Sequence, residues 1–127
     1  IEDLGENIRW NNGVYTTTGA IGIANGTGSA NTTAIIANQG GLATAYAAGS
    51  ASAYNGGGFS DWFLPSKDAL NEMYLNKATI NSTATANGGS NLKTTFYWSS
   101  TENDNDFAWE QDLGNGNQFP TDKDYTH

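Results

Sequence analysis

The clearest pattern of hydrophobic and polar positions lies near the end of the chain, in the stretch FYWSSTENDNDFAWEQDLGNGNQFP at residues 96–120. Alternate side chains of an extended chain point to opposite faces, so within FAWEQDL we expect Trp109 and Leu113 to face the core. Glu110 and Asp112 then face the solvent. The following GNG is typical of a hairpin turn, and NQFP starts a returning strand. This region therefore predicts antiparallel strands.

Earlier in the chain, apolar residues recur at spacings of three and four, which is the period of a helix. The segments TAIIANQ and LATAYAA predict helical structure after an N-cap at Asn31 or Thr32. Ser66 is placed to cap a second helix, which we expect to end near Asn76. The polar, glycine-containing residues 78–95 predict a long loop.

Two short apolar stretches, NIRW and DWFLPS, predict strands before and between these helices. The resulting order of strand, helix, helix and antiparallel strands predicts an α+β fold with a large share of loop. A length of 127 residues corresponds to one domain, so we expect residues 1–127 to form a single unit.

Composition limits both the core and the partners. Only 37% of the residues are hydrophobic, so aromatic residues must supply much of the buried surface. The net charge of −8 disfavours nucleic acids and anionic membranes as partners. No apolar run reaches the roughly 20 residues of a membrane-spanning helix, so we expect no insertion. The aromatic residues for which we expect structural roles are Trp62, Tyr97, Trp98 and Trp109.

The residues needed for nucleophilic catalysis are scarce. The chain has no cysteine, which removes thiol chemistry, disulfides and cysteine-type zinc sites. The only histidine is His127, so a serine nucleophile would lack a nearby base. We therefore predict that the protein is not an enzyme.

Two motifs carry a resemblance to a known family. DWFLPS at residues 61–66 is followed by a helical pattern and then by YWSSTE at residues 97–102, and Ala108-Trp109 precedes the glycine-containing hairpin. This combination resembles the C-terminal domain family of the Legionella collagen-like adhesin, related domains of which recur in bacterial surface proteins. The resemblance implies a C-type-lectin-like fold with two helices, a small twisted antiparallel sheet and long loops. It also implies a secreted, extracellular or cell-surface location, on a bacterium or a phage virion.

The chain departs from the family pattern at its end. The family's basic closing strand is absent, because the sequence stops at His127. We therefore expect the chain to be a fragment of a larger surface protein. An unpaired sheet edge is a template for strand addition, which leads to a second interpretation. In that interpretation the protein is a structural subunit of a surface filament or virion, completed by a strand from a neighbouring segment.

The amides and acids of the late loops are the candidate binding residues. Short polar side chains make several directional hydrogen bonds, which suits recognition of a polyol or a peptide backbone. We expect them to share one surface that binds a glycan or protein receptor. The candidate ligand-binding residues are Asn103, Asn105, Glu110, Asp112, Asn115 and Asn117.

Three acids in the same region are candidate metal ligands. Glu102, Asp104 and Asp106 alternate with amides and offer the hard oxygen atoms that calcium prefers. The stretch lacks the glycine and the downstream glutamate of an EF-hand loop, and a solvated acidic loop is the alternative. The sequence thus predicts a carbohydrate-binding or protein-binding adhesion module, with calcium as its one candidate cofactor.

Overall fold

The computed structural model describes residues 8–41 and 43–126 of the chain. These residues form four α-helices, two short 3-10 helices and one three-stranded antiparallel sheet, which confirms the predicted α+β class. In chain order the elements are α1 (Gly28–Gln39), η1 (Ala43–Ala45), α2 (Ala47–Ala53), η2 (Gly56–Gly58), α3 (Lys67–Leu75), α4 (Lys77–Ala86), β1 (Phe96–Glu102), β2 (Phe107–Asp112) and β3 (Gln118–Asp122).

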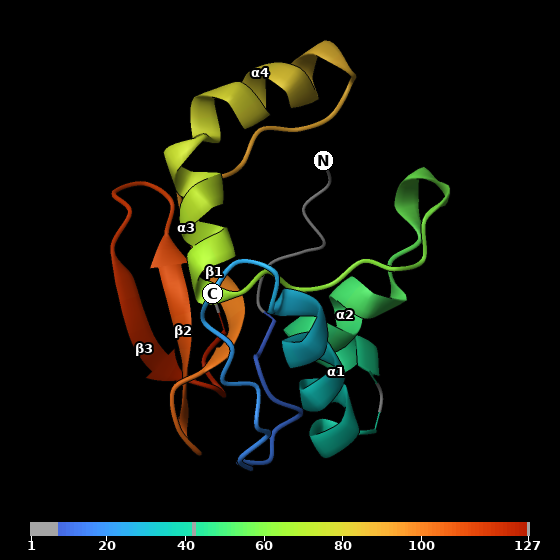
Figure 1. The fold of residues 1–127 in the computed structure, drawn as a ribbon, viewed down its shortest axis with the longest axis vertical. Helices are drawn as coiled ribbons and strands as arrows, with labels where there is room; N and C mark the ends of the chain where they lie inside the picture. Colours follow the sequence, from blue (N-terminus) through green and yellow to red (C-terminus); the bar gives the residue numbers. More distant parts are fainter. Residues whose placement is uncertain (1–7, 42, 127) are drawn as a thin grey trace.

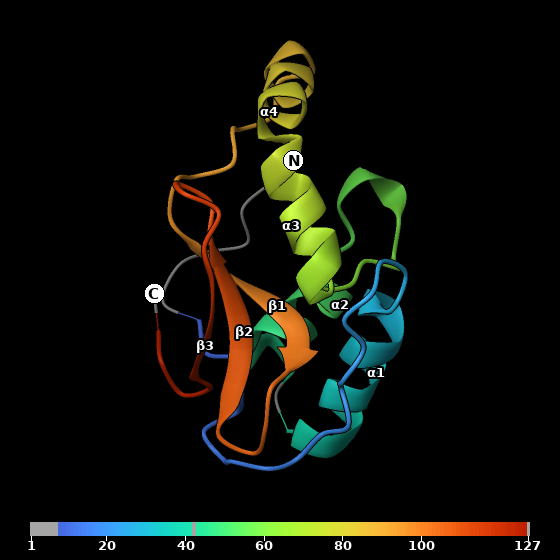
Figure 2. The same ribbon diagram turned by 60° about the vertical axis from the view of Figure 1, so that its left-hand side comes forward.

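The sheet and the first two helices stand on opposite sides of the molecule, with α3 beside the sheet (Figure 1). Helices α1 and α2 pack against each other, and α1 also contacts β1. Helix α3 packs against β1 and β2. Helix α4 continues from the end of α3 and projects away from the body, as Figure 2 shows from the side.

The central strand, β2, is covered on both faces. The sheet order is β1-β2-β3, so β2 is also paired along both edges. On one face, Ala108 is fully buried in the core cluster that contains Trp98. On the other face, Gln111 donates a hydrogen bond from Nε2 to Asn71 Oδ1 of α3 at 2.9 Å. Alternation of side chains along β2 therefore cannot reveal which face meets the solvent.

Two tryptophans from distant parts of the chain organise the core. Trp10 is fully buried, and its Nε1 donates a hydrogen bond to the carbonyl oxygen of Ser99 at 2.8 Å. Trp98 is also buried, and its Nε1 donates to the carbonyl oxygen of Ile8 at 3.1 Å. Each indole buries roughly 150–250 Å² with its single donor satisfied, so a chain with few hydrophobic residues can still form a core.

The predicted cap of α3 is confirmed. The Oγ of Ser66 accepts a hydrogen bond from the backbone N of Ala69 at 3.3 Å, and the helix ends at Leu75. Ser66 is itself fully buried, and its Oγ also donates to the carbonyl oxygen of Ala24 at 3.0 Å. The cap thus joins the helix start to an early loop.

The predicted cap of α1 is wrong. The helix begins at Gly28, before both candidate residues, and Thr27 at its N-cap makes no side-chain capping bond. Asn31 and Thr32 are buried within the helix. Their side chains bond to other loops: Asn31 Nδ2 to the Gly22 carbonyl at 2.7 Å, for example. Long-range bonding of these amide and hydroxyl groups replaced the local cap.

The second helical segment is interrupted at Tyr46. This residue is extended, with φ −140° and ψ 162°, and forms a parallel bridge with Arg9. Helix α2 begins only at Ala47, one residue later. Leu42, at the start of LATAYAA, lies outside the described residues.

The long loop predicted at residues 78–95 is wrong over its first half, because α4 continues to Ala86. The chain after the helix folds back along it, and this packing buries Ala84 and Leu92. The backbone N of Leu92 donates to Asn81 Oδ1 at 2.7 Å, which fixes the returning segment. Tertiary contacts therefore outweigh the weak helix propensity of its asparagines and threonines.

The two short strands predicted from apolar stretches are also wrong. DWFLPS is irregular along its whole length and makes no strand. The described part of NIRW, residues 8–10, contributes only the single bridge at Arg9. Both segments are held by individual hydrogen bonds to other parts of the chain instead: the backbone N of Ala47 donates to the Arg9 carbonyl at 2.9 Å, and that of Leu64 donates to Thr32 Oγ1 at 3.0 Å.

Candidate functional site

The sheet connectivity separates the candidate residues into two groups. Residues 103–106 join β1 to β2 at one end of the sheet, and residues 113–117 join β2 to β3 at the other (Figure 1). In the register, Phe107 opposes Asp122 next to the first turn. Gln111 opposes Gln118 next to the second. We call these two regions the 103–106 end and the hairpin end; the single surface expected from the sequence is wrong.

Glu110 belongs to neither end. The expectation that it faces the solvent is wrong, because it is only 5% exposed and lies on the covered face of β2 with Ala108. Its Oε1 accepts a hydrogen bond from Thr121 Oγ1 of β3 at 2.7 Å. The side chain therefore links two strands, and in this conformation it offers almost no surface to a ligand. Asp112, two residues later, is half-buried.

A buried ion pair underlies the 103–106 end. Lys123 Nζ donates to Glu102 Oε1 at 2.6 Å, and the two side chains are 0% and 2% exposed. The same carboxylate accepts from the backbone N of Thr18 at 2.9 Å and of Gly19 at 3.2 Å. Lys123 Nζ also donates to the carbonyl oxygen of Thr16 at 3.0 Å. The pair thus ties the ends of β1 and β3 to residues 16–19.

The pair is surrounded by further contacts that keep it dry and fixed. Lys123 Nζ lies 4.8 Å from the centroid of the Trp10 ring, where the cation meets the negative face of the indole. Asn38 of α1 donates from Nδ2 to the Thr18 carbonyl at 3.0 Å, so α1 also holds the 16–19 segment. Buried ions need such complete hydrogen bonding to offset their loss of hydration.

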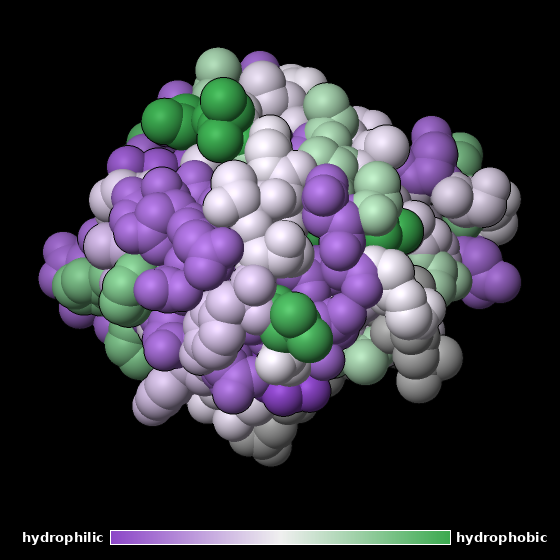
Figure 3. All heavy atoms as spheres, turned by 90° about the horizontal axis from the view of Figure 1, so that it is seen from below, coloured by the Kyte–Doolittle hydropathy of each residue, from purple (hydrophilic) through white to green (hydrophobic). Residues whose placement is uncertain are grey.

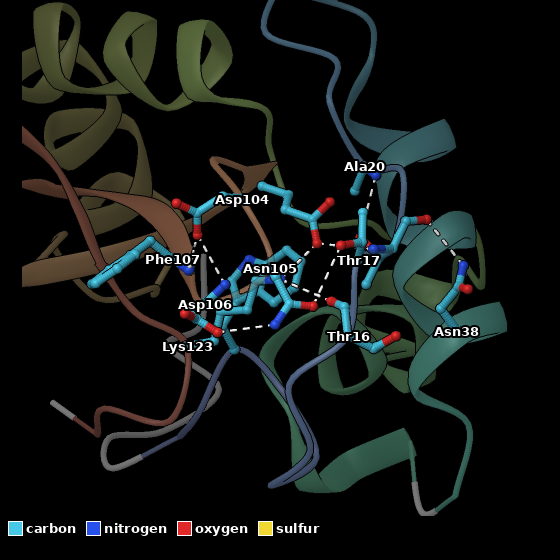
Figure 4. Close-up of polar contacts among 12 residues, drawn as sticks. Thr16, Thr17, Ala20, Asn38, Asp104, Asn105, Asp106, Phe107 and Lys123 are labelled. Carbon is cyan, nitrogen blue, oxygen red and sulfur yellow. Dashed lines mark hydrogen bonds and ion pairs between the residues drawn. The ribbon is translucent and has the colours of Figure 1, made fainter.

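Polar side chains from two distant segments face each other above this support (Figure 4). Thr17 Oγ1 lies 3.4 Å from Asn105 Oδ1, and Asn105 Nδ2 donates to Asp106 Oδ1 at 2.9 Å. Asp104 Oδ1 accepts from the backbone N of Asp106 and of Phe107, both at 2.8 Å. Asn103 is exposed in the same turn. The loop is therefore closed by its own side chains, with amide and carboxylate oxygens left facing outward.

A third segment reaches this end through Tyr15 and Asp122. The exposed Tyr15 hydroxyl donates to Asp122 Oδ1 at 2.6 Å. That hydrogen bond, assisted by partial desolvation and by the charges of Asp122, Asp124 and Asp106, raises the pKa of Tyr15 to about 12. Arg9 NH1 forms an exposed ion pair with Asp124 at 2.8 Å. Seen from this end, the surface is largely hydrophilic, with isolated hydrophobic residues (Figure 3).

The three candidate metal ligands do not converge. The Glu102 carboxylate is buried and already bonded to Lys123 and to two backbone N atoms, while Asp104 and Asp106 lie in the exposed turn. Over residues 8–41 and 43–126, no group of three or more His, Cys, Asp or Glu side chains is arranged to hold a metal ion. Calcium binding stays a prediction, and of the three candidate ligands only Asp104 and Asp106 are exposed to solvent.

The hairpin end is built differently. Asn115 Oδ1 accepts from the backbone N of Asn117 at 2.9 Å, and Asp112 Oδ1 accepts from the N of Gly114 at 2.7 Å. Gly116 has φ 84°, and a Cβ there would overlap the Tyr74 ring of α3. Asn115 and Asn117 are exposed, and the Asn115 side chain bonds within its own turn. Other segments reach this end through its backbone: Lys77 Nζ of α4 donates to the Leu113 carbonyl at 2.9 Å, and the backbone N of Leu113 donates to the Thr95 carbonyl at 2.9 Å.

The aromatic residues do not all behave as expected. Trp98 is buried and Trp109 is half-buried, with Lys67 Nζ 3.6 Å from its ring centroid. Tyr97 is half-buried in β1. A core role for Trp62 is wrong, because 47% of its surface is exposed. Its motif, DWFLPS, forms a loop on the surface rather than an inner strand.

Sequence reasoning missed the residues that support the 103–106 end. Lys123, Thr17 and Tyr15 are separated from the turn by long stretches of sequence, and no local pattern marks them. A lysine between two aspartates near the end of the chain is indistinguishable from an exposed surface charge. Only the register of β3 against β2 places Lys123 beside Glu102.

No protein-family model, curated protein or solved structure matched this chain. The C-type-lectin-like fold implied by the motifs therefore stays a prediction. Within the part of the chain that the structure describes, none of the helices is both long and apolar enough to cross a membrane.

Proposed function

We propose that this protein is an extracellular adhesion module that binds a glycan or a protein receptor non-covalently through the 103–106 end of its sheet. The ligand-contacting residues in this proposal are Asn103, Asn105 and Asp106, with Thr17 and Tyr15 beside them. No catalytic residue is assigned, and the location on a cell surface or virion follows from the resemblance to surface adhesins.

The observation that carries the proposal is the meeting of three distant segments on one rigid support. Residues 15–19, 103–106 and 122–124 are brought together by the buried pair of Glu102 and Lys123. A site whose polar groups are already fixed loses little conformational entropy when a ligand binds. The hairpin end is also joined to other segments, through the hydrogen bond from Lys77 Nζ to the Leu113 carbonyl and the packing of Gly116 against Tyr74. Among the described residues, however, the buried ion pair lies under the 103–106 end alone.

The chemistry of the surface favours a neutral or basic ligand. Amide, hydroxyl and carboxylate groups dominate it, and these groups bond well to sugar hydroxyls and to peptide backbones. The net charge of −8 repels sulfated and other strongly anionic glycans. A neutral glycan or a basic protein surface is therefore the expected receptor.

A binding screen with matched variants tests the proposal. Purified protein is screened on a mixed glycan and peptide array, and each hit is then measured for the double variant Thr17→Ala/Asn105→Ala. The control is Asn115→Ala/Asn117→Ala, which removes two exposed side chains from the opposite end. We expect at least a tenfold loss of affinity in the first variant and less than twofold in the second. The reverse order would transfer the site to the hairpin end and refute the proposal.

The calcium prediction is a separate arm of the same screen. Each hit is repeated with calcium and with chelator, and Asp104→Asn/Asp106→Asn is compared with wild type. A hit that depends on calcium and is lost in this variant supports a metal in the turn. A hit whose affinity does not change in chelator supports the adhesion module and rules out calcium as its cofactor.

A structural subunit is the second candidate, and the free edge of β3 favours it. The outer edge of β1 is occupied: the backbone N of Ser100 donates to the Pro65 carbonyl, and that of Glu102 to the Ala20 carbonyl. Strand β3 has no strand on its outer side in the sheet order. However, Pro120 lies at the middle of this strand and opposes Trp109.

Pro120 weakens the case for strand addition. The backbone N of Lys123 donates to the Asp106 carbonyl, and that of Asp112 donates to the Asn117 carbonyl. Because hydrogen-bonded and non-hydrogen-bonded pairs alternate along an antiparallel ladder, the backbone N of Pro120 points away from β2. Proline supplies no donor at that position, which is how edge strands discourage pairing. Concentration-dependent assembly measured by light scattering, lost on Phe119→Lys at the same edge, would favour the subunit; a monomer at all concentrations would disfavour it.

A further inference from the structure

A second surface, unrelated to the 103–106 end, carries exposed aromatic rings. Residues 54–63, which we call the aromatic loop, project from the side of the molecule that faces away from the sheet (Figure 1). Phe59 is 63% exposed, Trp62 47% and Phe63 46%. Large aromatic side chains that remain this exposed lose the free energy of burial, so their accumulation in one loop requires an explanation.

The rings are held in place by contacts within the loop. Trp62 Nε1 donates to the carbonyl oxygen of Gly56 at 3.1 Å, and the Tyr54 and Trp62 rings are tilted by 46° with centroids 5.5 Å apart. A Cβ at Gly56 would overlap the Tyr54 ring, so glycine is needed for the ring to lie there. The Trp62 ring is thus oriented before any ligand arrives, which lowers the entropic cost of binding.

Phe63 anchors the base of the loop. A Cβ at Gly28 would lie 2.9 Å from the Phe63 ring, which shows how closely this ring approaches the start of α1. The next residue, Leu64, is half-buried and bonded through its backbone to Thr32. The loop therefore stands on a helix of the core and is not a free excursion.

The charge around the rings favours a neutral ligand. Residues 47–66 contain no lysine and no arginine, and Asp61 is their only acid. Asn55, Ser60 and Asp61 are exposed beside the aromatic residues and can bond to hydroxyl groups. The loop therefore has no cation to pair with a sulfate or phosphate group, and only one carboxylate to pair with a strongly basic partner.

The size of the exposed surface favours a small ligand over a protein. Three rings, each about half exposed, offer roughly 300 Å² of aromatic surface if each buries roughly 150–250 Å² in full. A stable protein–protein interface needs about 800 Å² from each partner. The loop alone falls well below that area, but it can cover one or two sugar rings.

We propose that the aromatic loop is a binding site for a neutral saccharide, with the apolar face of a sugar ring stacked on Trp62. The C–H groups on one face of a pyranose pack on the indole, and Asn55, Ser60 or Asp61 accepts or donates hydrogen bonds at its rim. This site is independent of the receptor site proposed at the 103–106 end, and either can exist without the other.

The test is a titration of the whole chain with three neutral oligosaccharides, cellohexaose, chitohexaose and maltohexaose. Binding is followed through the four indole N–H signals in a ¹H–¹⁵N NMR spectrum, assigned by single Trp→Phe variants. We expect at least one oligosaccharide to shift the Trp62 signal with a Kd on the order of 1 mM. Trp62→Ala should weaken that binding at least tenfold, as followed through the backbone amide signals of residues 55–61 in the same spectrum, with the Trp10, Trp98 and Trp109 signals unchanged as evidence of folding.

Two control variants make the outcomes separable. Ile21→Ala removes another exposed apolar side chain, 71% exposed, and Asn105→Ala alters the other proposed site. In both variants the Trp62 signal should titrate with the same Kd as in wild type. The proposal is overturned if none of the three saccharides shifts the Trp62 signal, or if Trp62→Ala binds as well as wild type. Loss of saccharide binding only in Asn105→Ala would also overturn it, while supporting the function proposed for the 103–106 end.

Discussion

The two ends of the sheet carry similar residues but are supported in different ways. Each has exposed asparagines in a short turn between antiparallel strands. At the 103–106 end, the turn lies over a buried ion pair that also holds residues 16–19. At the hairpin end, Lys77 Nζ of α4 donates to the Leu113 carbonyl at 2.9 Å and Gly116 packs against Tyr74 of α3, so two helices hold the turn and no buried ion pair of the described residues lies under it. Composition alone therefore cannot distinguish a turn that lies over a buried ion pair from a turn that is held by neighbouring helices.

The largest effect should come from the ion pair. Lys123→Met leaves the Glu102 carboxylate buried without its cation, and such a break costs about 3–5 kcal/mol of unfolding free energy. Urea denaturation of the variant and of wild type measures the loss. The exposed pair of Arg9 and Asp124 is the control, because Arg9→Ala should cost about 1 kcal/mol or less.

A double variant shows whether the loss comes from the orphaned charge. Glu102→Leu/Lys123→Met removes both ions, so it should be more stable than either single variant. A single variant that loses less than about 1 kcal/mol would mean that the pair is not a support, and the contrast between the two ends would disappear.

The next effect concerns the hairpin end. Gly116 has φ 84°, a conformation that L residues adopt with strain, and an added Cβ would also meet the Tyr74 ring. Gly116→Ala should therefore lower the unfolding free energy by about 1–3 kcal/mol. Gly88→Ala is the matched control, since Gly88 has a similar φ of 79° with open space around it. Equal losses would show that the backbone strain of an L residue at positive φ, and not the contact with Tyr74, causes the loss of stability in Gly116→Ala.

Receptor binding sharpens the same contrast. If the 103–106 end is the site, Gly116→Ala should leave the affinity for any array hit unchanged despite its loss of stability. A fall in affinity that matches the fall for Thr17→Ala/Asn105→Ala would mean that binding reports general stability rather than a local surface.

A smaller effect is expected from the turn itself. Asp104 Oδ1 accepts two backbone hydrogen bonds, from Asp106 and Phe107, so Asp104→Ala leaves two donors to the solvent. We expect a loss of about 1 kcal/mol, because exposed donors regain water. Hydrogen exchange at the two amides should accelerate, while exchange in β2 stays slow. Asp104→Asn, which keeps the accepting oxygen, should restore most of the protection.

The sequence was informative where periodicity and local chemistry decide the structure. The three late strands and the Ser66 cap follow from alternation and from a hydroxyl before a helical run. The sequence did not predict the structure where contacts between distant segments determine it. Glu110 alternates as an exposed residue should, yet α3 and the core cover both faces of its strand. The partner of Glu102 lies 21 positions away, and only the strand register brings it there.

The dependence on contacts between distant segments also explains why the two proposed binding surfaces could not be located from the sequence. The candidate residues of the late loops were found by composition, but their division between opposite ends of the sheet depends on the order of strands. Trp62 was expected in the core because aromatic residues in a chain poor in hydrophobic residues are usually buried. Its exposure depends on the Gly56 contact and on the irregular backbone of DWFLPS, which no periodicity predicts.

The smallest effect is a dependence of stability on alkaline pH. Tyr15 donates its hydroxyl proton to Asp122, and its pKa rises from 10.0 to about 12 in the folded protein. The unfolded chain therefore binds fewer protons than the folded chain between these two values, so stability falls as the pH rises through that window. Below pH 10 the contribution is fully present, and above pH 12 it is lost. Tyr15→Phe cannot form the bond, so the difference in stability between wild type and this variant should shrink between pH 10 and pH 12. Ultraviolet titration of the phenols gives a second reading, because the variant should lack the phenol with a pKa of about 12. A difference that stays constant across the window would mean that the hydroxyl bonds to water in place of Asp122, and that the third segment of the 103–106 end is not held there.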